Sequence, residues 1–183
     1  MVVSAKERIL NAAQARLLTG GPTSLVLDAI ASDAGVSKGG LLYHFPSKDD
    51  LIGGLCDRML ASFDERLTAA CDADPNPNGA WTRAYLDSTV TGDGKPADDS
   101  AQLMAGLLAS LGRDSEHLEV IRRRFAGWHE KLEQDGIDPT RASIVRLAAD
   151  GLWLSALLGL PQLAPEIGQK ILATLRSMTH DTT

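Results

Sequence analysis

Apolar residues at four-residue intervals set the fold class of this chain. Between residues 51 and 67 they form an unbroken series: Leu51, Leu55, Met59, Phe63 and Leu67. This spacing places one apolar stripe along a face of an α-helix, whereas a half-buried strand would alternate apolar and polar residues. The same helical spacing recurs along the chain, and strand-like alternation is nearly absent. The sequence therefore predicts an all-α protein.

Capping residues divide the helical pattern into segments. Thr23 or Ser24 is expected to cap a second helix and Ser37 a third, because such side chains accept from the unpaired N–H groups of a helix start. Ser47, with Asp50 three residues later, resembles a capping box and predicts the start of a long fourth helix. The second and third helices are expected over 24–34 and 37–45. Further helices are expected over 80–91, 100–111, 115–134, 140–160 and 165–178.

Two of these short helices, joined by a turn at Gly35, form a helix-turn-helix. The second helix of this motif enters the major groove, with its N-terminal residues nearest to the base edges. Gly39 and Gly40 each destabilise a helix by roughly 1 kcal/mol relative to Ala, a reasonable cost where a bulky side chain would hold the backbone away from DNA. The candidate DNA-binding residues offer hydrogen-bond donors or close approach: Ser37, Lys38, Gly39, Gly40, Tyr43, His44 and Lys48.

The segment IASDAGVSKGGLLYHFPSKDDL, residues 30–51, resembles the signature of the TetR family of bacterial transcriptional regulators. That signature reads roughly I-A-x-x-A-G-V-S-x-G-x-L-Y-x-H-F-x-S-K-x-x-L. Two departures stand out: Leu42 occupies the usual tyrosine position, and Val26 falls near the position of a frequent hydroxyl residue. The resemblance implies a ligand-responsive regulator, in most cases a repressor, that binds a pseudo-palindromic operator in double-stranded DNA as a dimer.

The resemblance also divides the chain into two expected domains. Residues 1–48 would form an N-terminal three-helix helix-turn-helix DNA-binding domain, and residues 49–183 an α-helical bundle for ligand binding and dimerisation. The formal charge of the chain is −6, yet residues 1–48 hold five basic residues against three acidic ones. A mildly basic head on an acidic body suits DNA binding by the smaller domain.

The last two expected helices carry apolar stripes that suit a dimer interface. The first stripe advances by alternating steps of three and four, like a coiled-coil seam with a small residue at its centre, and the second advances in steps of four. Long stripes on a helix pair are what a symmetric four-helix interface needs. The interface candidates are Ile144, Leu147, Gly151, Leu154, Leu158, Leu163, Ile167, Ile171 and Leu175.

Family members commonly bind a small molecule between their central helices, and a pocket of that kind is mostly apolar with few polar groups. The candidates for it are Trp81, Met104, Leu107, Leu108, Trp128, Asp150 and Trp153. Each apolar residue among them has plain core packing as its alternative. For Asp150 the alternatives are a salt bridge to Arg146 and a counter-charge for a cationic aromatic ligand.

Two short segments, GLLYHFPS and LAADGLW, further resemble multidrug-sensing, CgmR-like members of the family. They favour control of drug efflux by an apolar or cationic aromatic ligand. Control of a catabolic operon by a metabolite is the alternative.

No motif in the chain calls for an enzyme. The sequence has no Gly-rich phosphate loop, nucleophile elbow or paired catalytic carboxylates, so we expect a non-enzymatic protein without a cofactor. His117, His129 and His180 are widely spaced, and none forms a helix-type pair with a second His or Cys, so no metal site is expected. A helical enzyme or an interaction module on the same fold is the alternative.

The two isolated cysteines are not a disulfide scaffold. Cys56 follows Leu55 on a strongly apolar helix, which favours a buried structural thiol over a redox switch with Cys71. The N-terminus is charged by its sixth residue and lacks the apolar core of a signal peptide. The longest apolar run, residues 151–161, is too short to cross a bilayer. We therefore expect a cytoplasmic protein with no membrane partner.

Two further runs have two interpretations each. Gly53 and Gly54, near the start of the fourth helix, give it either local compliance or tight packing. The three arginines at 122–124 suggest a salt-bridged outer face more than a second anionic partner, because consecutive helical residues point in different directions.

Ile30, Leu41 and Phe45 have the spacing of core residues rather than of DNA contacts.

Overall fold

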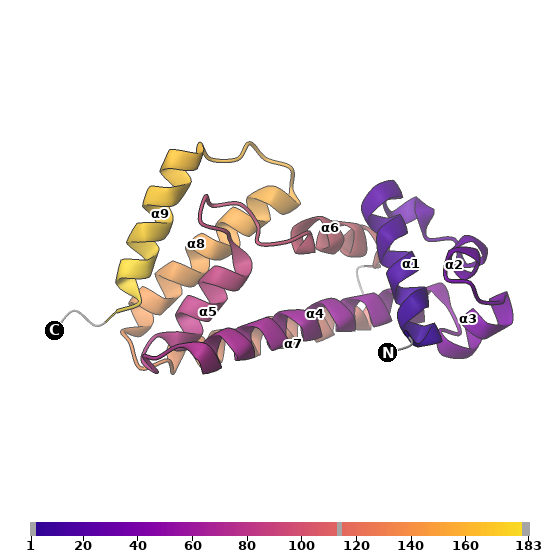
Figure 1. Ribbon diagram of the computed structural model, residues 1–183, viewed down its shortest axis with the longest axis horizontal. Coiled ribbons are helices and arrows are strands. Elements are labelled where there is room, and N and C mark those ends of the chain that lie inside the picture. Colours follow the sequence, from indigo (N-terminus) through magenta and orange to yellow (C-terminus); the bar gives the residue numbers. More distant parts are fainter. Residues whose placement is uncertain (1–2, 113–114, 181–183) are drawn as a thin grey trace. The chain divides into compact units, whose positions relative to one another are not determined.

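The structure is a computed structural model, and it describes residues 3–112 and 115–180. Within these ranges the chain is almost entirely helical, as predicted, apart from an isolated bridge between Val90 and Pro96 (Figure 1). The elements are α1 (Ala5–Gly20), η1 (Pro22–Ser24), α2 (Leu27–Asp33), α3 (Lys38–His44), α4 (Lys48–Ala73), α5 (Ala80–Thr89), α6 (Ser100–Ser110), α7 (Glu116–Glu133), α8 (Pro139–Leu157) and α9 (Pro165–Met178).

The chain forms two compact units. The head unit comprises Met1–Met59 and Gln102–Val120, and the body unit comprises Leu60–Ala101 and Ile121–Thr183. Both α4 and α7 contribute residues to each unit. The head unit thus combines the N-terminal helices with nearly all of α6 and the start of α7, a grouping that no sequence pattern indicates. The expected domain boundary at residue 48 stays a prediction.

Two of the three expected helix caps are confirmed. The Ser37 hydroxyl accepts a hydrogen bond from the Gly40 backbone N–H at 3.0 Å and so caps α3. At the start of α4, the Ser47 hydroxyl accepts from the Asp50 N–H at 3.0 Å and donates to the Asp50 carboxylate at 2.6 Å. These bonds satisfy backbone donors that the first helical turn leaves unpaired. They fix where α3 and α4 begin.

The expected cap of the second helix is wrong. Helix α2 begins at Leu27, its N-cap is Val26, and no side chain caps it. The Ser24 hydroxyl instead donates to the carbonyl oxygens of Arg16 at 2.7 Å and Gly21 at 2.6 Å. Ser24 therefore closes the 3₁₀ turn after α1, and the second helix starts three residues later than expected.

A small apolar core holds α1, α2 and α3 together in the head unit. Ile9, Ile30 and Leu41 have no exposed surface, and Phe45 is also buried. Full burial of such a side chain stabilises the fold by roughly 1.5–3 kcal/mol. The core assignment of Ile30, Leu41 and Phe45 is confirmed. Gly35, with φ of +62°, adopts the left-handed conformation between α2 and α3 that glycine favours.

Tight packing, the second interpretation of Gly53 and Gly54, is confirmed by their surroundings. A Cβ on Gly54 would lie 2.6 Å from the Phe45 ring and 3.3 Å from Leu10, and a Cβ on Gly53 would overlap the His117 imidazole. The two glycines let Phe45, Leu10 and the His117 ring at the start of α7 reach the α4 backbone. The His117 ring also lies 3.2 Å from the Asp49 carboxylate.

Polar contacts attach two further helices to α1. The Arg58 guanidinium of α4 donates to the Leu10 carbonyl at 2.9 Å and to the Gln14 amide oxygen at 2.5 Å. From α6, the Gln102 amide donates to the carbonyl of Leu18 at 2.9 Å. Helix α1 is therefore held by α4 and α6 as well as by α2 and α3.

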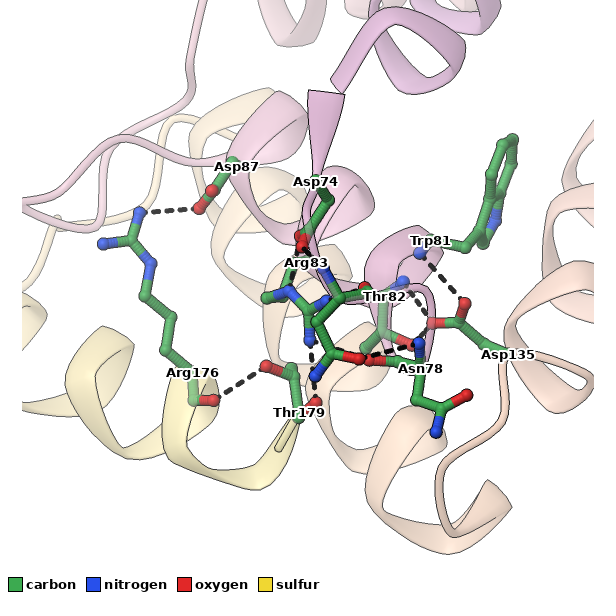
Figure 2. Close-up of polar contacts among 10 residues, drawn as sticks. Asp74, Asn78, Trp81, Thr82, Arg83, Asp87, Asp135, Arg176 and Thr179 are labelled. Atoms are coloured by element: carbon green, nitrogen blue, oxygen red, sulfur yellow. Dashed lines mark hydrogen bonds and ion pairs between the residues drawn. The ribbon is translucent and has the colours of Figure 1, made fainter. Parts of the chain in front are cut away.

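In the body unit, a polar network ties the start of α5 to the loop before it, to the segment after α7 and to the end of α9 (Figure 2). The Asp135 carboxylate accepts from the backbone N–H groups of Trp81 at 3.0 Å and Thr82 at 2.7 Å, and so caps α5. The Arg83 guanidinium contacts the Asp74 carboxylate at 2.6 Å and the Thr179 carbonyl at 2.9 Å. These bonds position Trp81 and the N-terminal half of α5.

Helix α8 is shorter than expected. Its N-cap is Asp138, whose carboxylate accepts from the backbone N–H groups of Thr140 and Arg141. The helix ends at Leu157, not at residue 160, because Gly159 turns the chain with φ of +65°. Leu158, expected inside the helix, is its C-cap residue. Helices α8 and α9 lie side by side in the body unit (Figure 1).

Candidate functional site

The candidate DNA-binding residues gather on α3 and its two flanks. Ser37 precedes the helix, Lys48 opens the next one, and the other five lie within α3. Five of the seven are exposed, whereas Gly40 and His44 are half-buried. The structure thus brings the whole set together in the head unit, while contact of each residue with DNA stays a prediction.

The first turn of α3 carries a single side chain beyond the backbone. It consists of Lys38, Gly39 and Gly40. A Cβ on Gly39 would meet no atom closer than the Ser37 hydroxyl at 4.0 Å, and the residue has no left-handed φ. Nothing in the fold of the head unit therefore requires glycine at position 39. Its absent side chain leaves the backbone open to a partner outside the subunit.

Aromatic and imidazole rings extend the same surface toward the end of α3. Tyr43 is 83% exposed, and its ring lies edge-on to the His44 ring at 5.2 Å between centroids. Leu42, at the family's usual tyrosine position, is half-buried and offers no hydroxyl. An exposed large aromatic residue on a small helix costs solvation, so Tyr43 has the placement of a contact residue.

One partner of this surface was missed from the sequence. Asp28, in the first turn of α2, lies 3.0 Å and 3.1 Å through its two carboxylate oxygens from the Lys38 ammonium. The two residues are ten positions apart, and only the packing of α2 against α3 brings them together. A second exposed pair in the head unit joins Arg16 to Asp33 at 2.6 Å.

The α8 stripe expected at a dimer interface is exposed within the subunit. Leu147 is 59% exposed, and Ile144, Gly151, Leu154 and Leu158 are exposed with it. Leu163 before α9 and Ile167 within it are also exposed, and Ile171 is half-buried. A row of exposed leucines and isoleucines of this length indicates an interaction surface.

Leu175 does not belong to that exposed row. It is only 5% exposed because it packs inside the body unit. The four-residue spacing of α9 therefore continues from the exposed face into the core. Leu175 leaves almost no side chain for a second subunit, so we exclude it from the interface.

The candidate ligand residues fall in two groups. Met104, Leu107 and Leu108 lie on α6 in the head unit, where the first two are buried and Leu108 is exposed. The body unit holds the others: Trp81, Trp128, Asp150 and Trp153. Trp81 and Trp128 are buried, and Asp150 and Trp153 are half-buried.

Trp128 lies in an aromatic cluster that the sequence did not reveal. Its ring centroid lies 4.7 Å from Phe63, 4.8 Å from Phe125 and 6.5 Å from Tyr85. These residues come from α4, α5 and α7, so their clustering depends on tertiary packing. The Trp128 indole N–H donates to the Asp64 carboxylate at 2.6 Å, and Asp64 also accepts from Arg124. For Arg124, the salt-bridge interpretation of the arginine run is confirmed.

Asp150 stands at the edge of this cluster and has two partners. Its carboxylate accepts from the Tyr85 hydroxyl at 2.6 Å and contacts the Arg146 guanidinium at 3.2 Å. The expected salt bridge between Arg146 and Asp150 is confirmed. Burial, and secondarily the Asp150 charge, raises the pKa of Tyr85, so this hydroxyl stays a donor.

Arg146 also lies 3.1 Å from the imidazole of His129. Burial lowers the pKa of His129, and the positive charge of Arg146 lowers it further. His129 is thus favoured in the neutral form, which can accept a hydrogen bond from the guanidinium.

Trp81 presents a different polar feature. It is 8% exposed, and within the described residues its indole N–H is a buried donor with no hydrogen-bond partner. The ammonium of Lys131 lies 4.2 Å from the centre of its ring, a cation–π contact. Trp153, in contrast, donates through its indole N–H to the Ser100 hydroxyl at 3.0 Å.

Cys56 is buried, as the sequence predicted. Burial, together with the charges of Asp57 and Asp49, raises the pKa of its thiol to about 11. A thiol with this pKa remains protonated near neutral pH and is a poor nucleophile. Cys56 therefore packs as a small apolar residue.

Two family models match the chain. Residues 9–55 match the model described as bacterial regulatory proteins, tetR family. Residues 79–180, more than half of the chain, match the model described as tetracyclin repressor-like, C-terminal domain. The chain belongs to the TetR family. TetR-family proteins are transcriptional regulators with an N-terminal helix-turn-helix domain for DNA and a C-terminal ligand-binding domain.

Solved structures share this TetR fold over nearly the whole chain. A transcriptional regulator from Rhodococcus sp. Rha1 is 24% identical over 96% of both chains, with a TM-score of 0.70. The multidrug binding protein EbrR in complex with ethidium is 24% identical over 96% of this chain and 99% of its own, with a TM-score of 0.64. EbrR in complex with malachite green is 25% identical over 93% and 96%, with a TM-score of 0.58.

None of the helices in the described ranges combines the length and apolarity needed to cross a bilayer. Over the same ranges, no group of three or more His, Cys, Asp or Glu side chains is placed to hold a metal ion.

Proposed function

We propose that this chain represses transcription in the cytoplasm as a homodimer that binds a pseudo-palindromic operator. The observation that carries the proposal is the first turn of α3, where Lys38 is followed by two glycines and no packing requires the first of them, Gly39. A helix start without bulky side chains brings backbone N–H groups close to phosphate oxygens, while Lys38 reaches a base edge or a phosphate. Tyr43, His44 and Lys48 then fix the register on the duplex.

The dimer places two copies of α3 in successive major grooves, about one helical turn apart in the simplest operator. The exposed α8 residues supply the contact between subunits, with Leu163 and Ile167 at its margin. An isologous interface of this kind repeats each apolar contact twice. In this proposal, residues 1–48 read the DNA and residues 49–183 assemble the dimer.

Ligand binding releases the operator in this proposal. A ligand that binds better to subunits with wrongly spaced recognition helices shifts the population away from the DNA-bound state by its differential affinity. The aromatic cluster around Trp128 and the carboxylate of Asp150 suit a flat aromatic cation. The complexes of the multidrug binding protein EbrR with ethidium and malachite green support that ligand class. Control of drug efflux is the regulatory role that such a ligand favours.

Selection of duplexes from a random library tests the DNA-binding part of the proposal. The wild-type chain should enrich a pseudo-palindromic sequence, and Lys38→Ala and Lys48→Ala should weaken binding to it. Loss of one phosphate contact should also reduce the slope of log K against log salt by about 0.9. Enrichment of no sequence, with both variants silent in vivo, would favour a helical enzyme or interaction module on this fold.

Ethidium titration tests the ligand part. Asp150→Asn should weaken ethidium binding, because it removes the negative charge while keeping a side chain of similar shape. Asp87→Asn is the matched control, since Asp87 also lies in the body unit and pairs with an arginine, Arg176, at 2.7 Å. Equal ethidium affinity in all three proteins would exclude Asp150 as the counter-charge. Operator release by a metabolite but not by ethidium would favour control of a catabolic operon.

A further inference from the structure

The pair formed by Asp28 and Lys38 links α2 to the helix start that is proposed to read DNA. Both carboxylate oxygens of Asp28 lie within 3.1 Å of the Lys38 ammonium. The two side chains are 66% and 59% exposed, so the pair lies on the surface. We propose that Asp28 is a positioning residue for DNA specificity, which acts by holding Lys38 in place. This inference rests on the proposed function.

The composition of the first turn makes the position of Lys38 decisive. Residues 39 and 40 have no side chains, so Lys38 alone can reach a base edge from that turn. An unrestrained lysine is a flexible point charge that contacts phosphates of any sequence. A lysine ammonium has three N–H donors, and one held by a carboxylate still donates to an acceptor on the partner. The restraint therefore favours contact of Lys38 with one acceptor at a fixed position over contact with phosphates at many positions along the duplex.

The net charge of the Asp28–Lys38 pair also favours the operator over other duplexes. The pair is neutral overall, so it adds little to the attraction for arbitrary duplex DNA. Asp28 therefore lowers non-specific affinity more than operator affinity, and it raises the ratio between the two.

The experiment compares Asp28→Asn with Asp33→Asn, a matched control in the head unit. Asp33 pairs with Arg16 at 2.6 Å, so both variants remove one exposed carboxylate from an ion pair and change the net charge equally. Each protein is titrated against a duplex enriched by the wild-type chain and against a scrambled duplex of the same length, at several salt concentrations.

For Asp28→Asn we expect binding to the scrambled duplex to tighten, with a slope of log K against log salt steeper by about 0.9. The ratio of operator to scrambled affinity should fall by about fivefold or more. Asp33→Asn should change this ratio by less than about twofold. An equal fall in the ratio for both variants would overturn the proposal, because net charge alone would then explain the effect.

The double variant separates action through Lys38 from direct contact. In a Lys38→Met background, Asp28→Asn should leave the ratio unchanged, because no ammonium remains to be held. If Asp28→Asn lowers operator affinity equally with and without Lys38, Asp28 itself reads the DNA and the proposal is wrong. If the wild-type chain enriches no duplex, the proposed function fails before this comparison begins.

Discussion

At the residue scale, glycines in the head unit have opposite surroundings. Gly54 lies under the Phe45 ring, and a Cβ there would lie 2.6 Å from it. Gly39 faces open space. The sequence shows pairs of glycines near two helix starts. It links Gly39 and Gly40 to close approach to DNA and leaves Gly53 and Gly54 with two interpretations. The structure assigns one pair to internal packing and leaves Gly39 for an external partner.

Alanine at each position should therefore have opposite effects on stability. Gly54→Ala should lower the free energy of unfolding by about 1–3 kcal/mol, because the added methyl group forces Phe45 or Leu10 to move. Gly39→Ala should raise it by up to about 1 kcal/mol, because alanine favours the helix and meets no neighbour. Urea unfolding of both variants measures the difference.

Gly39→Ala should nevertheless weaken binding to a selected operator, since its methyl group holds the α3 backbone away from the duplex. Urea unfolding and operator titration of the same preparation separate the two effects. Unchanged operator affinity in a stabilised Gly39→Ala protein would show that the glycine does not serve DNA approach.

At the element scale, most helix starts could be predicted and most helix partners could not. Ser37 and Ser47 cap α3 and α4 as expected, because capping is local in sequence. The second helix was misplaced because the Ser24 hydroxyl bonds to the turn behind it rather than to the helix ahead. The Asp28–Lys38 pair and the aromatic cluster around Trp128 join separate elements, so no local pattern indicates them.

The cap of α8 gives a prediction about acid stability. Hydrogen bonds from the backbone N–H groups of Arg141 and Thr140 lower the pKa of Asp138 below its usual value. A carboxyl with a lowered folded-state pKa stabilises the fold above its unfolded-state pKa, near 4, and loses that contribution as the pH falls through the folded value. Asparagine caps a helix about as well but does not titrate.

Asp138→Asn should therefore leave the melting temperature near pH 7 almost unchanged and reduce its fall as the pH drops below about 4. Thermal melting monitored by circular dichroism across this range measures both. An acid-induced fall as steep as that of the wild-type protein would show that the Asp138 carboxylate has no part in it.

At the scale of the whole molecule, the exposed α8 face is the feature that a single subunit leaves unexplained. Its spacing could be read from the sequence, and so could the choice of α8. The exclusion of Leu175 could not, because a four-residue spacing does not reveal where α9 turns its stripe into the core. The split of the candidate ligand residues between the two units was equally invisible, since it depends on where α6 packs.

A charged residue in that face should dissociate the dimer. Leu147→Glu would bury two like charges across a two-fold interface, which costs more than the roughly 1.5–3 kcal/mol of each lost leucine contact. Sedimentation should show a shift from dimer to monomer. Leu108→Glu, an exposed leucine on α6 in the head unit, should leave the dimer intact. A monomeric wild-type protein would contradict the assignment of the α8 face.

Titration of the wild-type chain against three duplexes tests whether two copies of α3 read the operator. The duplexes are the enriched operator, a scrambled version, and the operator with five base pairs inserted between its half-sites. We predict that two chains bind the operator, with an affinity that falls steeply with salt. Binding to the scrambled duplex should be much weaker because it lacks the half-sites. Binding to the inserted duplex should also be much weaker, because the insertion turns one half-site to the opposite face of the duplex. Equal affinity for all three duplexes would contradict the claim that this chain reads DNA as a dimer through two copies of α3.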